Sequence, residues 1–403
     1  MLSNFDQKVD RQGTYCTQWD YIEDRFGVKD LLPFSISDTD FLCPEPIMGV
    51  LKKRIEHALF GYTRWNHEDF KSAIQKWYLS RFQTEVNGDS IVYSPAVIYT
   101  VSKLIAILSN PGDGIIINTP NYDAFFKMIK AHDRIMLPNE LLYENENYVI
   151  DFKDLEVKLS HPKAKVFILC SPHNPTGRVW TAEELKKILD LCEKYNVFII
   201  SDEIHMDILR KGKRHIPITK AAKNLDNVCI CTSASKTFNT PGLGGSYAII
   251  PNEKIRERFL IALKEEDGLS SASNLGMLAL MTAYEDCNDW MNELNEYLDG
   301  NMKRIKEFFL ENYPEIEFSI PESTYLAWFD VAPLGYSMDE LQQALIHRGK
   351  VAIMPGVTYG LNNESYLRLN AGCSRSKLEE GLKRFKIAVD YLQEKNNKTI
   401  LAG

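Results

Sequence analysis

Short, continuous runs of apolar residues alternate with amphipathic stretches through the middle of the chain. Five of these runs are predicted to be strands, at residues 114–119, 165–170, 197–201, 228–232 and 246–250. Their apolar residues are consecutive rather than alternating, which is typical of strands covered by helices on both faces. Between the second and third runs, Thr181 and Glu184 have the spacing of a helix capping box. The pattern predicts an open α/β sheet.

The pattern changes after about residue 290. A long charged helix is predicted over 292–312, short strands over 325–329 and 366–369, and a last helix from about Lys377. This part reads as a smaller α+β domain, and the aromatic-rich start of the chain reads as an arm that packs on it. We therefore expect three parts, namely an N-terminal arm at 1–45, a large domain at 46–290 and a small C-terminal domain at 291–403.

Composition and charge narrow the classes of protein. The 403 residues carry a formal net charge of −8, which argues against nucleic acid or an anionic membrane as the main partner. No apolar run is long enough to span a membrane, and the first residues do not resemble a secretory signal. The eight cysteines are scattered without a Cys-x-x-Cys pair, so we expect reduced thiols, a cytoplasmic protein and no metal site.

Residues that can take part in catalysis or ligand binding follow four of the predicted strands. Ligands of open α/β sheets gather at the carboxyl ends of the strands, so these residues are expected to lie together. In chain order they are Tyr122, then Asn174, then Asp202 and His205, then Ser233, Ser235 and Lys236. An aromatic ring, an amide, a carboxylate, hydroxyls and an amine are the groups needed to hold a flat, phosphorylated, heteroaromatic aldehyde.

Each of these residues has a specific predicted role. The amine of Lys236 can condense with a carbonyl, and the carboxylate of Asp202 can keep a pyridine nitrogen protonated. Asn174 can donate to a phenolic oxygen, and Tyr122 can stack on a ring face. Taken singly, Lys236 could be a surface lysine, Asp202 a helix cap and Tyr122 a core aromatic. Together they predict pyridoxal 5′-phosphate held as a Schiff base on Lys236.

Two further sites complete the prediction. Arg368 can form a bidentate pair with a substrate carboxylate, although it could also belong to a surface ion pair. Asn174 and Tyr122 are expected to contact the substrate as well. Ala96 and Val97 begin a predicted helix that runs to about Ser109, whose first N–H groups can bind the cofactor phosphate unless this is an ordinary helix start.

The order of these residues resembles that of the fold type I pyridoxal-phosphate enzymes, the aspartate aminotransferase superfamily. Within it, the sequence is similar to the MalY/PatB-type cystathionine β-lyases, or C–S lyases. The matching strings lie at residues 10–14, 16–21, 60–65, 201–207, 323–328 and 351–356. The resemblance implies a large domain with a mostly parallel seven-stranded sheet covered by helices, and a smaller α+β domain. It also implies a homodimer with its sites at the interface, in which Tyr62 reaches the cofactor phosphate of the neighbouring subunit.

Two departures from the usual aminotransferase pattern favour the lyase group. His205 stands where aminotransferases commonly have tyrosine, and Gly244 stands where they commonly have a phosphate-binding arginine. The phosphate would then depend on Ser233, Ser235, Tyr62 and backbone N–H groups.

The resemblance therefore implies an enzyme of methionine metabolism that performs α,β-elimination on cystathionine or a related cysteine S-conjugate. The products would be a thiol such as homocysteine, pyruvate and ammonia, with Lys236 as the general base. The alternative is an aminotransferase on the same fold. A regulatory protein that reuses the fold is less favoured, because Lys236, Asp202 and Asn174 are all intact.

Overall fold

The computed structural model describes residues 3–269, 271–360 and 362–402, and the chain divides into two compact units. The larger unit comprises Cys43–Asn174 and Arg178–Asn292, and the smaller comprises Met1–Leu42, Pro175–Gly177 and Glu293–Gly403. The domain boundaries predicted at 45/46 and 290/291 stay a prediction. Each unit has its own hydrophobic core.

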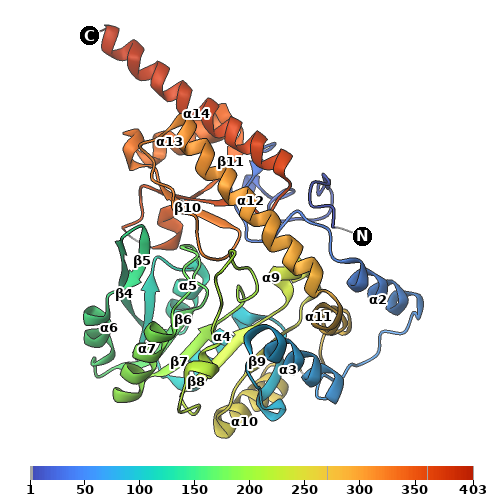
Figure 1. The fold of residues 1–403 in the computed structure, drawn as a ribbon. Coiled ribbons are helices and arrows are strands. Elements are labelled where there is room, and N and C mark those ends of the chain that lie inside the picture. Colours follow the sequence, from blue (N-terminus) through green and yellow to red (C-terminus); the bar gives the residue numbers. More distant parts are fainter. Residues whose placement is uncertain (1–2, 270, 361, 403) are drawn as a thin grey trace. The chain divides into compact units, whose positions relative to one another are not determined.

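The larger unit is built on one mixed sheet of eight strands in the order β2-β9-β8-β7-β6-β3-β4-β5 (Figure 1). The strands are β2 (Ile91–Ser94), β3 (Gly114–Thr119), β4 (Ile135–Glu144), β5 (Asn147–Ile150), β6 (Ala164–Cys170), β7 (Phe198–Asp202), β8 (Val228–Thr232) and β9 (Ser246–Ile249). The five neighbours from β8 to β4 are parallel, and β9 runs antiparallel to both β8 and β2. This arrangement confirms the predicted α/β class and mostly parallel sheet.

The sheet has eight strands where seven were expected. Strand β4 is ten residues long, and its second half runs beyond β3 to pair with β5 in an antiparallel hairpin. The turn residues Asn145 and Glu146 both have positive φ, at 50° and 61°. A two-residue turn of this kind matches the twist of a hairpin, so the extra strand is a local extension of the sheet edge.

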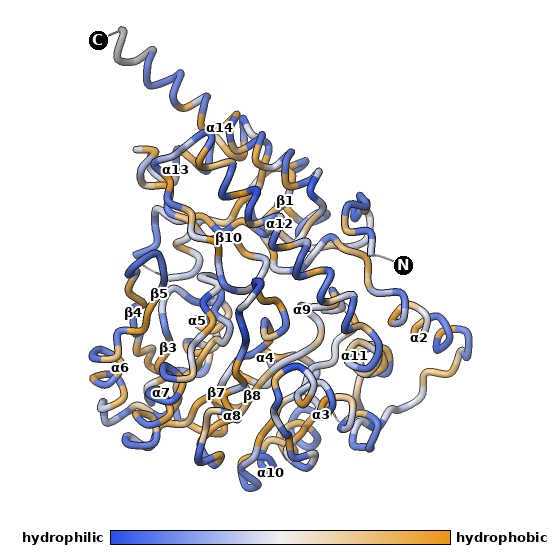
Figure 2. The backbone as a smooth tube through the Cα atoms, viewed as in Figure 1, coloured by the Kyte–Doolittle hydropathy of each residue, from blue (hydrophilic) through white to orange (hydrophobic). Residues whose placement is uncertain are grey.

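Helices surround the sheet of the larger unit. They are α2 (Glu45–Glu56), α3 (Glu68–Phe82), α4 (Val97–Leu108), α5 (Asp123–Ala131), α6 (Phe152–Leu159), α7 (Ala182–Lys194), α8 (Ile218–Ala221), α9 (Ser235–Phe238), α10 (Glu253–Ile261) and α11 (Asn274–Asp286). The predicted capping box at Thr181 and Glu184 is present at the start of α7. Every residue of β7 and β8 is buried, as continuous apolar runs predict, and Figure 2 shows these strands mostly in orange.

The smaller unit contains a three-stranded antiparallel sheet in the order β10-β13-β12, with a separate pair β1-β11. The strands are β1 (Leu32–Pro33), β10 (Leu326–Asp330), β11 (Val351–Ala352), β12 (Met354–Pro355) and β13 (Tyr366–Asn370). The helices are α1 (Glu23–Phe26), α13 (Met338–Ala344) and α14 (Arg375–Ala402), and α12 (Asn288–Asn312) contributes from Glu293 onward.

The first forty residues are fixed to the rest of the smaller unit by specific contacts. Strand β1 pairs with β11, and Asp40 accepts from both Arg11 (2.9 Å) and Lys377 (2.5 Å). The ring of Phe34 lies against Gly381 of α14 so closely that a Cβ there would come within 2.3 Å of it. Glycine is therefore required at this contact.

In the described part of the chain, no helix is both long enough and apolar enough to cross a membrane. Within the same residues, no group of three or more His, Cys, Asp or Glu side chains is placed to hold a metal ion.

Candidate active site

The carboxyl ends of β6, β7 and β8 meet at one edge of the large sheet. The strand register pairs Asp202 with Cys170 on one side and with Cys231 on the other. Backbone hydrogen bonds continue this alignment. The N–H of Ser171 donates to the backbone oxygen of Asp202 (2.8 Å), and the N–H of Glu203 donates to the backbone oxygen of Cys231 (2.9 Å). The chain segments that carry Asn174, Asp202 and Lys236 therefore leave the sheet side by side, as the strand-end argument predicts.

Asp202 is the last residue of β7 and is only 4% exposed. Burial raises its pKa from 3.8 to about 7, and the charge of Glu203 adds to that rise. The N–H of Ile204 (3.1 Å) and the charge of Lys236 act in the opposite direction. A buried carboxylate of this kind is stabilised by a cationic partner, so a protonated pyridine nitrogen fits its surroundings.

Lys236 lies on α9, a helix of only four residues that directly follows β8. The next two residues, Thr237 and Phe238, are fully buried, whereas Lys236 is half-buried. Asn239 ends the helix in a left-handed conformation with φ of 55°. The turn is thus anchored through two buried side chains, and the charge of Lys236 beside them acts on Asp202.

Asn174 lies in the loop after β6 and is 5% exposed. Its N–H donates to the sulfur of Cys170 (3.4 Å), and the indole of Trp180 donates to the backbone oxygen of Cys170 (2.9 Å). The adjacent His173 is fully buried, and burial lowers the pKa of its imidazole to about 3, so the ring is neutral near pH 7. His173 was not predicted from the sequence; its position beside Asn174 in the Ser-Pro-His-Asn-Pro string was the available signal.

The start of α4 lies against the glycine-rich loop that precedes β9. Ala96 is the N-cap of α4, and Val97 is its first residue. The N–H of Gly245 donates to the backbone oxygen of Pro95 (3.3 Å), which brings the glycine-rich loop 241–245 against this helix start. Free N–H groups in the first turn of a helix attract anions, so this region suits a phosphate.

Ser233 and Ser235 differ in what their groups can offer such an anion. The hydroxyl of Ser233 donates to the backbone oxygen of Gly245 (2.8 Å) and accepts from the N–H of Ser235 (3.1 Å). Ser233 is 3% exposed, whereas Ser235 is half-buried. Ser233 therefore shapes the loop, and Ser235 is the better placed of the two to donate to a phosphate.

The backbone explains why glycine occupies position 244. Gly244 has φ of +69°, a conformation that L side chains rarely adopt, and Gly245 has φ of +91°. A Cβ on Gly276, at the start of α11, would lie 2.3 Å from the backbone oxygen of Gly244. Two backbone segments are thus in direct contact here, and an arginine at 244 would be strained.

Tyr122 and His205 complete the predicted residues of the larger unit near this edge. Tyr122 is the half-buried N-cap residue of α5, and its ring packs edge-on against Phe125 at 5.6 Å. His205 is 2% exposed and belongs to the strand-end segment, which we define as residues 202–207.

The strand-end segment contains further buried acids that sequence reasoning did not identify. Glu203 accepts from Ser201 (2.9 Å) and Ile218 N–H (2.9 Å), and its other oxygen lies 2.8 Å from Nε2 of His215. Asp207 accepts hydrogen bonds from α3 and α9. The signal in the sequence was the acidic string Asp-Glu-Ile-His-Met-Asp directly after a buried strand.

Tyr62, unlike these buried residues, is exposed to solvent. It belongs to the exposed segment, which we define as residues 58–64 between α2 and α3, and its side chain is fully exposed. Leu59 and Phe60 are 64% and 61% exposed. Asn274 holds the segment by accepting from Arg54 (2.7 Å) and donating to Thr63 (3.2 Å). A hollow of about 410 Å³ lies between residues 60–63 and 271–275.

Arg368 belongs to the smaller unit and is described within it. It lies in the middle of β13, is 4% exposed, and donates from Nη2 to the backbone oxygen of Ser35 (2.8 Å). Its guanidinium stacks over the ring of Tyr359, 4.4 Å from the centroid, and Tyr359 packs edge-on against Trp328. Arg368 is therefore a buried, oriented cation rather than part of a surface ion pair.

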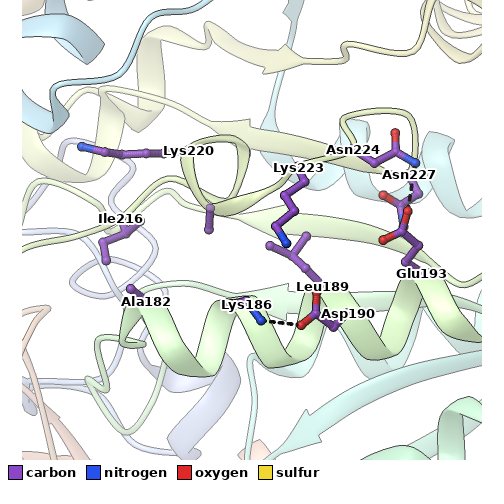
Figure 3. A pocket seen from close by; sticks show the side chains of 11 residues that line it. Ala182, Lys186, Leu189, Asp190, Glu193, Ile216, Lys220, Lys223, Asn224 and Asn227 are labelled. Atoms are coloured by element: carbon purple, nitrogen blue, oxygen red, sulfur yellow. Dashed lines mark hydrogen bonds and ion pairs between the residues drawn. The ribbon is translucent and has the colours of Figure 1, made fainter.

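A second cavity, of about 390 Å³, lies between α7 and the residues around α8 (Figure 3). Its polar side chains are solvent-exposed and partly paired, as for Lys186 and Asp190 at 2.9 Å. It contains none of the residues predicted to bind a cofactor or substrate.

Comparison with known proteins agrees with this geometry. The model of the family "Aminotransferase class I and II" matches residues 29–385. Protein MalY of Escherichia coli is 46% identical, with 94% of this chain and 97% of MalY covered. Cystathionine beta-lyase PatB of Bacillus subtilis is 38% identical, with 96% and 100% covered. The crystal structure of cystalysin from Treponema denticola, which contains a pyridoxal 5′-phosphate cofactor, is 33% identical, has a TM-score of 0.92, and covers 97% of this chain and 100% of its own.

Proposed function

The chain belongs to the aminotransferase class I and II family, and within that family we propose that it is a pyridoxal 5′-phosphate-dependent carbon–sulfur lyase. It would act on cystathionine or a related cysteine S-conjugate and release a thiol such as homocysteine, pyruvate and ammonia. The observation that carries this proposal is the 38% identity to a cystathionine beta-lyase over the whole of that protein. The buried Asp202 beside Lys236 supports the cofactor assignment.

Several residues of the larger unit would hold the cofactor. When bound, pyridoxal 5′-phosphate supplies an electron-withdrawing ring that stabilises a carbanion at the substrate Cα. Asp202 would bind the protonated ring nitrogen, Asn174 would donate to the phenolic oxygen, and Tyr122 would cover one ring face. Ser235 and the first N–H groups of α4, from Ala96 and Val97, would bind the phosphate. His205 and Ser233 would support the residues that make these contacts.

Lys236 would have two tasks. Its amine would anchor the cofactor aldehyde, and after displacement by substrate the neutral amine would remove the proton from the substrate Cα. The electron pair of the Cα–H bond would then form a Cα=Cβ bond while the Cβ–S bond breaks, and the sulfur would leave as a thiolate that is protonated to the thiol in solution. The enamine that is released would hydrolyse to pyruvate and ammonia.

Arg368 would select the substrate by its carboxylate. Its guanidinium is buried, stacked on Tyr359 and tied to Ser35, so its planar fork is held in one orientation. A preorganised guanidinium binds a carboxylate with two parallel hydrogen bonds and little loss of entropy. The contact would orient the Cα–H bond for proton removal.

We further propose that the enzyme is a homodimer in which Tyr62 completes the phosphate site of the neighbouring subunit. The support is the exposed segment, whose Leu59, Phe60 and Tyr62 present large apolar surface. A cytoplasmic location is proposed as well, and the eight free cysteines agree with it.

Pyruvate release tests the proposed function directly. The purified enzyme, given pyridoxal 5′-phosphate and cystathionine but no keto acid, should release pyruvate continuously. An aminotransferase would stop after one turnover per site, and a regulatory protein would release none. Lys236→Ala should lower the rate at least about a thousandfold, because it removes the general base and the anchor together. Retained turnover in that variant would contradict the role of Lys236.

A further inference from the structure

Asp207 is a buried carboxylate at the far end of the strand-end segment, and it joins three elements of the larger unit. It is 1% exposed, and its oxygens accept from the indole Nε1 of Trp77 on α3 (3.0 Å) and from the hydroxyl of Thr237 on α9 (3.2 Å). Burial raises its pKa, while the charge of Arg81 and these two hydrogen bonds act against that rise. Each carboxylate oxygen thus holds a different helix.

The helix that Asp207 holds is too short to be stable by itself. Helix α9 has four residues, and its N-cap Ala234 provides no side-chain hydrogen bond. One turn of helix does not form in isolation, so tertiary contacts must fix its direction. Thr237 is the residue next to Lys236, and its hydroxyl bond to Asp207 therefore fixes α9 directly beside the catalytic amine along the chain.

Aromatic packing restricts Asp207 further. The ring of Trp77 stacks on Tyr284 with centroids 4.7 Å apart and an interplanar angle of 9°. The same ring packs edge-on against Phe238 of α9 at 6.2 Å, and the guanidinium of Arg81 lies 5.7 Å from it. Trp77 thus contacts both Asp207 and the helix that carries Lys236.

The other end of the strand-end segment is equally fixed. Thr232 of β8 donates to the backbone oxygen of Glu203 (3.1 Å), and Glu203 N–H donates to Cys231 (2.9 Å). Because the segment is held at Glu203 and at Asp207, its two ends keep a fixed position relative to each other. Asp202 lies at the first end and the contact to α9 at the second.

We propose that Asp207 is a positioning residue that sets the location of the Lys236 amine relative to the Asp202 carboxylate. Asp207 touches neither substrate nor cofactor; it acts through Thr237 and Trp77. The inference rests on the proposed roles of Lys236 and Asp202.

The test compares Asp207→Ala, Thr237→Val and the double variant. A displacement of the order of 1 Å at a catalytic group can lower a rate about a hundredfold. We expect kcat to fall about thirtyfold in Asp207→Ala and about tenfold in the nearly isosteric Thr237→Val. KM should change less than about threefold, since Arg368 is untouched, and capture of pyridoxal 5′-phosphate by the apoprotein should slow in parallel. The double variant should be no slower than Asp207→Ala, because both substitutions remove the same contact.

Two further variants separate positioning from simple stabilisation. Asp207→Asn keeps the shape and one acceptor, so it should restore kcat to within about threefold of the wild type. Tyr284→Phe is the matched control: it removes the hydroxyl contact to Tyr247 (3.0 Å) in the same buried layer but leaves α9 untouched. It should lower the Tm of the apoprotein by a few degrees and leave kcat unchanged.

The proposal is overturned if Asp207→Ala and Thr237→Val lower only the Tm, like Tyr284→Phe, or if their effects on kcat are additive. Should Asp207→Ala not fold, Thr237→Val and Asp207→Asn decide the matter. Capture of the cofactor is measured spectroscopically without substrate. A wild-type enzyme that captures cofactor but releases no pyruvate from cystathionine would therefore contradict the proposed function and leave the comparison of these variants valid.

Discussion

The strand-end segment and the exposed segment both carry residues assigned to the cofactor, but they are held in opposite ways. Residues 202–207 are almost wholly buried, and their acids are bonded to β8, α3, α9 and the start of α8. Residues 58–64 are mostly exposed and are held at Thr63, which accepts from Asn274 and from the N–H of Ala272 (3.3 Å). The acids of the first segment are bonded within one chain, whereas the second leaves the side chain of Tyr62 exposed. The difference separates what one chain provides by itself from what the proposed dimer would add.

The largest expected effect on activity comes from removing the carboxylate of Asp202 in the strand-end segment. Asp202→Ala should lower kcat/KM for pyruvate release about a thousandfold, because a buried ionic partner is worth roughly 3–5 kcal/mol. The matched control is Asp190→Ala, which removes an exposed carboxylate on α7 that pairs with Lys186. A similar, small effect of both variants would contradict the assignment of Asp202.

The exposed segment can be tested by mixing two impaired variants at a cofactor concentration too low to saturate Tyr62→Ala. Tyr62→Ala should bind the cofactor about tenfold more weakly, because it removes one phosphate hydrogen bond of 1–1.5 kcal/mol. If Tyr62 serves the neighbouring subunit, hybrid dimers with Lys236→Ala contain one intact site. An equal mixture after subunit exchange should then recover about a quarter of the wild-type activity. No recovery would place Tyr62 in the site of its own chain or outside any site.

The pH dependence of folding stability tests the burial of Asp202 in the strand-end segment. Burial holds the pKa of Asp202 near 7 in the folded chain, above its ordinary value of 3.8. The resulting stabilisation is present below about pH 4 and is lost as the pH rises through 7. The Asp202→Asn apoprotein should therefore be more stable than the wild type at pH 8, by about 4 kcal/mol, with little difference at pH 4. Urea unfolding at both pH values measures this, and equal stabilities at pH 8 would contradict the burial argument.

The smallest effect is expected from the support of the exposed segment. Asn274→Ala removes the contacts to Arg54 and Thr63 and should cost about 1 kcal/mol of folding stability. Cofactor affinity should fall only a few-fold, because Tyr62 itself is retained. Tyr15→Ala, which truncates an 84% exposed side chain of the arm, should change neither quantity. A loss as large as that of Tyr62→Ala would mean that Asn274 determines the position of Tyr62.

Much of the large sheet could be predicted from the sequence because buried parallel strands leave continuous apolar runs. Strands β3 and β8 have the predicted bounds, β6 and β9 differ by one residue at one end, and β7 differs by one residue at each end. Strands β2, β4 and β5 were not predicted, and in β5 the residues Asn147–Ile150 are only partly buried and have no such run. The carboxyl ends of these strands follow from their order, so the neighbourhood of Asn174, Asp202 and Lys236 was predictable.

The sequence by itself determined which residues follow each strand, because that depends only on local periodicity and spacing. The tertiary structure alone decided how those residues are used. The hydroxyl of Ser233 donates to Gly245, the backbone at Gly244 is left-handed, and Asp207 bonds to Trp77, 130 positions away along the chain. The choice of a hydrogen-bond partner and the burial that raises the pKa of Asp202 depend on segments that only packing brings together. No spacing along the chain contains that information.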